Sequence, residues 1–429
     1  MTTALAVLIC FFGLMILGMP IAYSMIVTGF ITINFFHPGI PLVIIPQRVF
    51  AGINNFILLC IPFFMLAGEL MSMTPLFDKL INLSKALVGH IRGGLSHVNI
   101  VVSMFFAGIT GAAVADTSAV GGILIPAMNK EGYPKGYTVA VTVSSSTLGV
   151  IIPPSNLMIV AALATGQSVA ILFMAGIIPG ILSGMAQLVV SFIYSYKYGY
   201  PKSSDMTWKD RVRIFWEGMP AIGIPVIIMG GILGGVVTPT EAADLTIFYA
   251  VVVGIFGLRS IPTMKRLYSS LVIVVERLGA VMFALGAAMV LGWIFAIAQV
   301  PDAIGAWILS VTTNSVIITI GMLITMLIVG TFMDPLPAIL IFTPIFLPIA
   351  ESIGMGKLHF TITMIFGFVI GLITPPVGSV LYVGSAISGM KVEEFVKDLI
   401  PFISAIIAIL ILLAFVPPLV TFIPNLLFQ

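Results

Sequence analysis

The chain has 429 residues, of which 60% are hydrophobic and only 34 are charged, 18 of them basic and 16 acidic. A soluble domain with about 25% charged residues would carry roughly 107 charges at this length. With a mean hydropathy of +1.21, the chain has too few polar side chains to cover a water-facing surface. The composition therefore excludes most soluble folds and predicts an all-α polytopic membrane protein in a lipid bilayer. A net charge of +2, without a basic cluster, gives no indication of a nucleic-acid partner.

Apolar segments of spanning or near-spanning length occur along the whole chain. In order they fall at about 3–18, 20–36, 57–72, 137–165, 168–196, 219–236, 243–258, 278–298, 359–388 and 400–424. Two further stretches, 97–128 and 314–350, are too long for one crossing and are interrupted at GITGAAVADTS and GTFMDPLP. We expect each of these two stretches to form a re-entrant hairpin that enters and leaves on one side of the membrane.

The basic residues predict an orientation. With both stretches treated as hairpins, 16 of the 18 Lys and Arg fall on one side, and only Arg48 and Lys357 fall on the other. The positive-inside rule then makes the basic side cytoplasmic and places the N-terminus outside. Three amphipathic segments, 40–56, 75–90 and 262–277, accompany the spans. They are predicted to lie at the membrane surface, either as braces of a fixed scaffold or as simple connectors.

The sequence also contains a repeat at a constant offset of 222 residues. In the predicted layout each unit crosses the membrane an odd number of times, so the second unit is inverted relative to the first. Inverted repeats with discontinuous helices are typical of secondary transporters. A polar segment, 197–218, links the two units. The matching pairs are Pro126 and Pro348, Pro153 and Pro375, Pro154 and Pro376, Pro179 and Pro401, Gly132 and Gly354, and Gly149 and Gly371.

Two carboxylates stand out because they are the only formal charges inside the broken stretches, Asp116 in the first and Asp334 in the second. Burial of a carboxylate at membrane depth costs about 2.5–3.5 kcal/mol even on a lenient scale. This cost favours a functional role, and we expect Asp116, with its neighbour Thr117, and Asp334 to bind substrate or couple transport. The alternative is that each hairpin tip reaches interfacial water, where the carboxylate only caps a half-helix.

The double prolines at 153–154 and 375–376 interrupt two apolar segments and leave carbonyl groups without helical partners. Such carbonyls, with nearby hydroxyls, bind a hard monovalent cation such as sodium. The amides that start the following half-helices, at Ser155 and Asn156 and at Gly378 and Ser379, are predicted to bind a carboxylate. A simple pair of helix kinks is the alternative. The predicted sodium ligands are Ser103, Thr110, Ser145, Gly149, Val150, Pro153, Gly330, Thr331, Gly371 and Thr374.

The sequence lacks the common motifs of ATP-driven pumps and hydrolases. No Walker A, H-E-x-x-H or G-x-S-x-G pattern occurs, and the two cysteines, Cys10 and Cys60, lie in apolar runs. We therefore predict no enzyme activity, no transition-metal site and no cofactor apart from coupling ions. Energy for transport is expected to come from an ion gradient rather than from an ATP site in this chain.

Five stretches of the chain resemble the large membrane subunit of the tripartite ATP-independent periplasmic (TRAP) transporters, in the ion transporter superfamily. The resemblance spans essentially the whole chain. The family's IPPS element is often preceded by Gly-Pro and followed by Ile, whereas this chain has Gly149-Val150 and Asn156, which leaves its substrate open. The stretches are IPFFMLAGELM (61–71), GAAVADTSAVGGILIPAM (111–128), LGVIIPPSNLMI (148–159), GIIPGI (176–181) and GGILGGVVTPTEAAD (230–244).

The resemblance implies an elevator-type, sodium-coupled importer of an acidic organic solute, of the sialic acid or C4-dicarboxylate class, in the bacterial inner membrane. It implies a small four-helix membrane subunit and a periplasmic solute-binding protein as partners. Residues 1–96 and 219–298 would form the scaffold, and residues 97–196 and 299–429 the transport domain, joined by the linker 197–218. A proton-coupled carrier that uses Asp116 and Asp334 is the alternative.

Overall fold

The computed structural model describes residues 2–203, 206–257 and 263–427, and the side chains of these residues except at 2, 109–110 and 255–257. Throughout this part of the chain the secondary structure is helical, apart from one isolated antiparallel bridge between Arg92 and Lys202. Six described helices are long and apolar enough to cross a membrane, or up to eight if two bent pairs each form one span. The prediction of an all-α polytopic membrane protein is confirmed, although several predicted spans are shorter helices.

The chain up to Thr110 forms short helices, and the apolar face of one of them, α5, is covered by other helices. The segment 75–90, one of the three predicted to lie at the membrane surface, contains the helix α5. Its residues Leu76, Phe77 and Leu80 are buried, because α5 packs on α6 and on α12 (Trp208–Leu233). Its apolar face is therefore occupied by protein. The helices are α1 (Thr2–Ile16), α2 (Ile21–Phe36), α3 (Ile44–Ile53), the 3-10 helix η1 (Phe56–Leu59), α4 (Cys60–Ser72), α5 (Leu76–Val88) and α6 (Gly94–Thr110).

The first broken stretch consists of α6 followed by a second helix that packs against it. The break falls at Gly111, where a φ of +59° ends α6 in a left-handed conformation that glycine adopts readily. The next apolar segment is broken at its double proline, as predicted. After α6 come α7 (Ala113–Lys130), α8 (Lys135–Ser145), α9 (Leu148–Ile151), α10 (Asn156–Thr165) and α11 (Val169–Tyr198).

The middle of the chain differs from the prediction in two places. The polar segment 197–218 is not all loop, because α12 begins within it, at Trp208, with Thr207 as its N-cap. The predicted surface segment 262–277 and the span 278–298 form one helix of 34 residues, α14. At 1.5 Å per residue α14 is about 51 Å long, well beyond the roughly 30 Å of a hydrocarbon core. The elements are α12 (Trp208–Leu233), α13 (Pro239–Val251), the π-helix η2 (Val252–Gly257), α14 (Met264–Ile297) and α15 (Val300–Val311).

The last part of the chain contains the second broken stretch and the second double proline. The predicted span 400–424 is two helices, because Pro417 and Pro418 remove the amide donors that would continue the first one. The helices are α16 (Ser315–Phe332), α17 (Pro335–Ser352), α18 (Lys357–Gly371), α19 (Ser379–Ser388), α20 (Val392–Phe415) and α21 (Pro418–Leu427).

The sequence repeat corresponds to a repeat in the order of helices. α7 begins at residue 113 and ends at 130, and α17 begins at 335 and ends at 352, so both ends differ by 222. The glycines that follow these helices, Gly132 and Gly354, have similar positive φ values of +88° and +81°. Both double prolines contain a cis peptide bond. The two halves therefore share the same local geometry at these matched positions.

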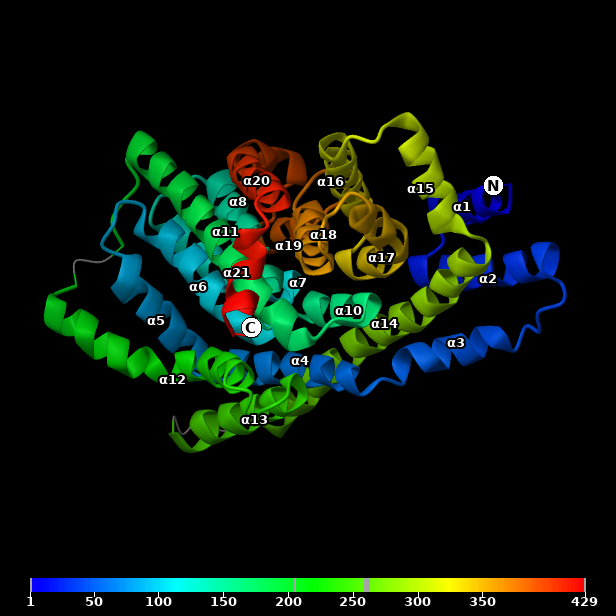
Figure 1. Ribbon diagram of the computed structural model, residues 1–429. Helices are drawn as coiled ribbons and strands as arrows, with labels where there is room; N and C mark the ends of the chain where they lie inside the picture. Colours follow the sequence, from blue (N-terminus) through cyan, green and yellow to red (C-terminus); the bar gives the residue numbers. More distant parts are fainter. Residues whose placement is uncertain (1, 204–205, 258–262, 428–429) are drawn as a thin grey trace.

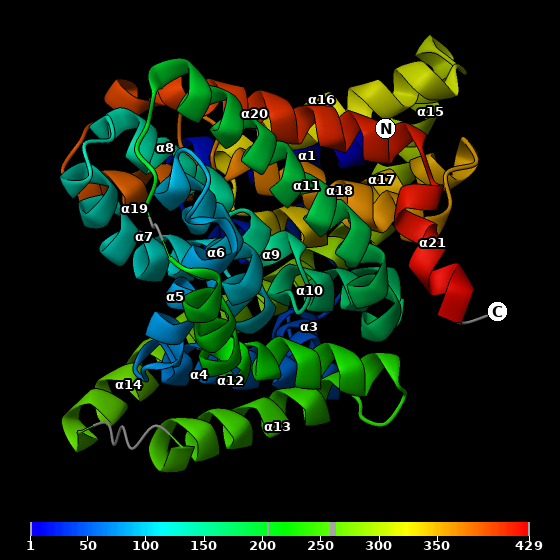
Figure 2. The same ribbon diagram turned by 90° about the vertical axis from the view of Figure 1, so that its left-hand side faces the viewer.

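The helices form two groups in space. Figure 1 shows α3, α4, α12, α13 and α14 together along one side of the molecule, which we call the lower layer, and Figure 2 shows the same separation from another side. Above it lies the upper bundle, formed by α6–α11 and α16–α20. Glycines allow close packing within the lower layer: a Cβ on Gly286 of α14 would lie 2.8 Å from a Val49 methyl group of α3.

In the upper bundle, α16 and α18 come into backbone contact through Gly330 and Gly371. A Cβ on Gly371 would collide with the Gly330 carbonyl group, and a Cβ on Gly330 would lie 3.0 Å from the Phe368 carbonyl oxygen. This contact holds the tip of the second broken stretch against the segment that leads to the second double proline.

Replacement of Gly371 by alanine is expected to lower the free energy of unfolding by about 1–3 kcal/mol, because the added methyl group overpacks a backbone contact. Gly321 on α16 provides the matched control, since a Cβ there meets nothing within 4 Å. The melting temperature of the detergent-purified protein should fall in Gly371→Ala and stay unchanged in Gly321→Ala. Equal melting temperatures for both variants would contradict this close approach.

Candidate functional site

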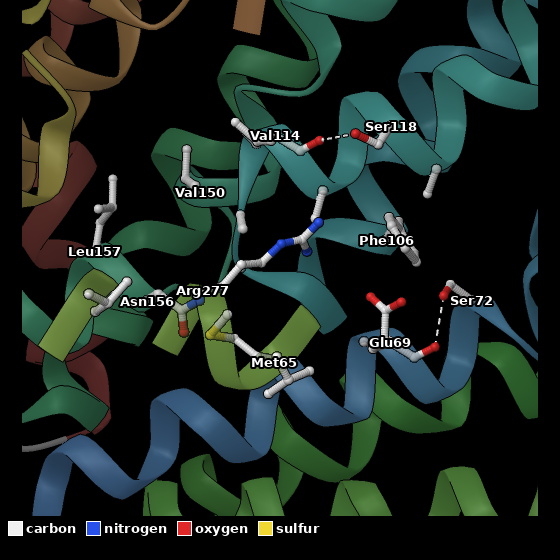
Figure 3. A pocket seen from close by; sticks show the side chains of 18 of the residues that line it. Met65, Glu69, Ser72, Phe106, Val114, Ser118, Val150, Asn156, Leu157 and Arg277 are labelled. Carbon is white, nitrogen blue, oxygen red and sulfur yellow. Dashed lines mark hydrogen bonds between the residues drawn. The ribbon is translucent and has the colours of Figure 1, made fainter. Parts of the chain in front are cut away.

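A pocket of about 600 Å³ lies where the upper bundle meets the lower layer. From the upper bundle it is lined by the segment at the start of α7, by Asn156 at the start of α10 and by Asp334 before α17. From the lower layer it is lined by Glu69 of α4 and Arg277 of α14. Figure 3 shows the side chains of Glu69, Asn156 and Arg277 facing this space. Both broken stretches and one double-proline break therefore converge on a single cavity.

Two capping residues fix the helix starts beside the pocket. Ser155 is the N-cap of α10, where its hydroxyl accepts from the Met158 amide and donates to the Val150 carbonyl oxygen over 2.6 Å. Asp334 is the N-cap of α17 and accepts from the Leu336 amide at 3.0 Å. The first amides of a helix have no intrahelical partners, so these side chains stabilise each helix at its first turn. The predicted half-helix starts at Asn156 and Ser379 are confirmed.

The pocket contains three charged side chains, Glu69, Arg277 and Asp334. The Arg277 side chain is exposed and, among the described residues, forms no ion pair or hydrogen bond. Glu69 accepts a hydrogen bond from the Ser270 hydroxyl at 3.3 Å. Asp334 is surrounded by protein on most sides. It is nevertheless exposed, because its side chain faces the open pocket.

Neither Glu69 nor Arg277 stands in a sequence pattern that indicates a site. Glu69 lies near the end of the predicted span 57–72, and Arg277 ends the predicted surface segment 262–277. The structure instead places Arg277 inside the continuous helix α14, on the same face as Ser270 and Val274. Val274 and Arg277 follow Ser270 by four and seven residues, a spacing that puts side chains on one helix face. That spacing is the signal that could have identified Arg277, once the helix was known to be continuous.

Asp116 does not line the pocket; it lies behind the hairpin tip, inside the upper bundle. Its side chain is fully buried, and within the described part of the chain neither carboxylate oxygen has a hydrogen-bond partner. The Ser103 hydroxyl lies beside it but donates to Ser145 at 3.1 Å instead. Gly149 packs directly against it, since a Cβ there would lie 3.4 Å from the Asp116 Cβ. The structure thus brings together Ser103, Ser145, Gly149 and Asp116.

A chain of buried hydrogen bonds continues from this cluster between α6 and α8. Ser145 donates to the Asn99 side-chain oxygen at 3.0 Å, and the Asn99 amide donates to the Thr142 hydroxyl at 2.7 Å. All three side chains are buried. The sequence does not single out Asn99, because it belongs to no motif and lies seven residues after the nearest preceding charged residue, Arg92.

The sodium ligands predicted in the second half of the chain come together mainly through contacts between their backbone groups. Gly330 contacts Gly371, and the Gly378 amide donates to the Thr331 carbonyl oxygen at 3.2 Å. The hydroxyls of Thr331 and Thr374 instead donate to carbonyl groups of their own helices, those of Ile328 and Ile370.

Two of the carbonyl oxygens near the breaks, those of Val150 and Gly371, have hydrogen-bond partners. Ser155 donates to Val150, and the Thr374 amide donates to Gly371 at 3.1 Å. Each of these oxygens keeps a second lone pair. The Pro153 carbonyl oxygen lies against α6, 3.6 Å from where a Cβ on Gly108 would be. The predicted ligand Thr110 has a side chain outside the described residues.

The residues predicted to bind substrate divide into two groups. Asn156 and Asp334 line the pocket, whereas Thr117 and Ser155 are fully buried and have their hydroxyls bonded to nearby carbonyl groups. Gly378 and Ser379 also lie outside the lining of this pocket, although Ser379 is exposed. Periodicity could not separate these groups, because it places residues on an element without showing which neighbour covers them.

The sequence matches a family model described as "Tripartite ATP-independent periplasmic transporter, DctM component" over residues 8–419. The chain belongs to this TRAP large-permease family. It is therefore a multi-pass membrane transporter subunit and not an enzyme. A solved structure, that of the YdaH transporter of Alcanivorax borkumensis, matches with a TM-score of 0.58 at 13% identity and covers 86% of each chain, which supports the fold alone.

Three relatives illustrate the range of this TRAP family. The uncharacterized protein YgiK of Salmonella typhimurium is 39% identical over 95% of this chain and 94% of its own. The isethionate TRAP transporter permease protein DctMQ of Oleidesulfovibrio alaskensis is 36% identical over 96% of this chain and 65% of its own. The sialic acid TRAP transporter large permease protein SiaM of Vibrio cholerae is 31% identical over 96% of both chains.

The pocket predicts different reactivity for two adjacent positions on α7. Ser118 is exposed and lines the pocket, whereas Thr117 is fully buried. In a background with Cys10→Ser and Cys60→Ala, a maleimide should label Ser118→Cys at least about tenfold faster than Thr117→Cys, since thiol reactivity follows exposure. The measurement is the labelling rate of the purified protein by mass spectrometry. Equal rates at the two positions would show that α7 is not oriented as described.

Proposed function

We propose that this chain is the permease of a sodium-coupled importer of an acidic organic solute. The observation that carries the proposal is the convergence of both broken stretches on one pocket, which also contains an arginine without an ion-pair partner among the described residues. Pockets of about 300–1,000 Å³ are the usual size for small-molecule sites. Discontinuous helices at matched positions of two halves mark the binding region in secondary transporters.

Asp116 supports the sodium part of this proposal. A buried carboxylate without a partner is costly, so a stable protein compensates it with a cation or a proton. The Ser103 hydroxyl lies beside Asp116, and hydrogen bonds link it to the Ser145 hydroxyl and then to the side-chain oxygen of Asn99. Oxygen ligands of this kind are the ones that hard cations prefer. We therefore assign the first sodium ion to this cluster, with Gly149 packed against it.

A second sodium ion fits the matching position of the other half. There, Gly330 approaches Gly371 through the backbone, and the Gly378 amide donates to the Thr331 carbonyl oxygen. Asp334 is not the repeat counterpart of Asp116, since the residue 222 positions after Asp116 is Ala338. The two sites would therefore differ in charge, the first with a carboxylate and the second with neutral oxygens only.

The division into a lower layer and an upper bundle supports an elevator mechanism. The upper bundle holds both matched sets of broken helices, and the pocket lies on its boundary with the lower layer. In this proposal the second unit is inverted relative to the first, α6–α11 and α16–α20 move as the transport domain, and α2–α4 and α12–α14 remain as the scaffold. The N-terminus is periplasmic, and the basic side is cytoplasmic.

The partners follow from the family, whose large permeases work with a small membrane subunit and a periplasmic solute-binding protein. We propose both as partners of this chain in the bacterial inner membrane. The relatives named for sialic acid and for isethionate support an organic anion as the solute. Sodium would serve as the coupling ion, with no further cofactor.

A hydroxyl deletion tests the first sodium site. Ser145→Ala removes a proposed ligand, so the sodium concentration for half-maximal uptake should rise about tenfold, the effect of a lost interaction of about 1.4 kcal/mol. The measurement is uptake into proteoliposomes that contain the chain, its small subunit and its binding protein. Ser144→Ala is the matched control, because that buried hydroxyl donates to the Val141 carbonyl oxygen outside the cluster. Uptake by the unmodified complex without a sodium gradient would contradict the proposal.

Neutralisation of Asp116 separates sodium coupling from the alternative of proton coupling. With sodium coupling, Asp116→Asn should weaken sodium dependence while uptake at saturating sodium is retained, because neutral oxygens still coordinate the ion. With proton coupling, the same variant should abolish uptake driven by a pH gradient, because the asparagine does not titrate. Uptake by the unmodified complex under separate sodium and pH gradients gives the reference for both comparisons.

A further inference from the structure

The charges in the pocket restrict the kind of anion that can bind there, an inference that rests on the proposed function. The pocket contains one cationic side chain, Arg277, and two carboxylates, Glu69 and Asp334. The three belong to three different helices or helix starts, in α14, in α4 and before α17. Counted by residue type, the side chains of the pocket therefore have a formal net charge of −1.

Arg277 is the group available for a solute anion. Its guanidinium is exposed to the pocket and, in residues 2–203, 206–257 and 263–427, has no ion-pair partner. Glu69 is held by the Ser270 hydroxyl, one of the residues on the Arg277 face of α14, and does not neutralise the arginine. Figure 3 shows Arg277 extending from α14 into the space that Glu69 and Asn156 also face.

We propose that Arg277 binds the single anionic group of the solute, and that Glu69 and Asp334 restrict the pocket to monoanionic solutes that carry hydroxyl groups. A guanidinium presents parallel donors that match a carboxylate or a sulfonate. The two carboxylates accept hydrogen bonds from hydroxyl groups, whereas a second anionic group on the solute would face like charges. The class is thus a sugar acid or a hydroxysulfonate rather than a dicarboxylate.

The Asn156 amide can contribute to the same recognition. Its side-chain oxygen is buried and has no partner among the described residues, so it is available to a donor on the solute. Arg277 belongs to the lower layer, whereas Asn156 and Asp334 belong to the upper bundle. A solute that binds Arg277 with its anionic group and the other two residues with its hydroxyls therefore bridges the two groups of helices.

The test is binding to the purified complex of this chain with its small subunit, in sodium chloride and in potassium chloride. The probes are N-acetylneuraminate and isethionate, which are hydroxylated monoanions, and succinate, which is a dicarboxylate. We expect at least one monoanion to bind more tightly than succinate. In Arg277→Gln this binding should weaken about 10- to 100-fold, and in Arg277→Lys by less, because the charge remains while the paired donors are lost.

Two further variants complete the design. Arg266→Gln is the matched control, since Arg266 is an exposed arginine on α14 outside the pocket, and it should bind like the unmodified protein. Asp334→Asn keeps an N-cap acceptor for α17 and should shift preference toward succinate about tenfold, because it removes a like charge.

The outcomes separate this inference from the proposed function. Tighter binding of succinate than of both monoanions, unchanged binding in Arg277→Gln, or no binding of any of the three acids would overturn the monoanion inference. Binding that depends on Arg277 but is equal in sodium and potassium would overturn sodium coupling alone and leave the assignment of the pocket in place.

Discussion

Backbone hydrogen bonding at membrane depth is the constraint on which this structure depends. A chain inside a lipid bilayer must satisfy its amide and carbonyl groups internally, so a helix can be broken only where other groups replace the lost bonds. Here Ser155 and Asp334 cap the helices that restart after a break, and glycines such as Gly371 let backbone segments approach one another. The same breaks place helix starts, carbonyl groups and side chains around one region, so the functional pocket is a consequence of how the breaks are stabilised.

The two carboxylates of the broken stretches, Asp116 and Asp334, lie in different environments. Asp334 faces the pocket and caps a helix, so it keeps access to solvent and has a partner. Asp116 is fully buried, and neither of its carboxylate oxygens has a hydrogen-bond partner within the described residues. The sequence places one in each broken stretch, although not at matching positions of the repeat. The structure separates them into a pocket residue and an interior residue, and this difference underlies the distinct roles that we propose.

Much of the fold could be predicted because it depends on local covalent properties. Proline removes a donor wherever it stands, so the breaks at Pro153–Pro154 and Pro375–Pro376 were expected and are present. The offset of 222 likewise predicted matching helices, and α7 and α17 match at both ends. Glu69 and Arg277 could not be predicted in this way. A charged residue at the end of an apolar run has the same pattern whether it lies in a loop, at the interface or in a cavity, and only the packing of α14 on α4 distinguishes these cases.

The sequence by itself determined the class of protein, the positions of the helix breaks, the repeat and the family resemblance, because composition, proline chemistry and periodicity act over a few residues. Only the tertiary structure decided which polar residues share a cavity. It brought Glu69, Asn156, Arg277 and Asp334 to one pocket, and it placed Asp116 and Ser103 behind the hairpin tip. The meeting of residues as distant in sequence as 69 and 334 at one pocket depends on the packing of whole helices, which no local pattern encodes. The charge composition of the pocket, and with it the inferred class of solute, follows from that packing.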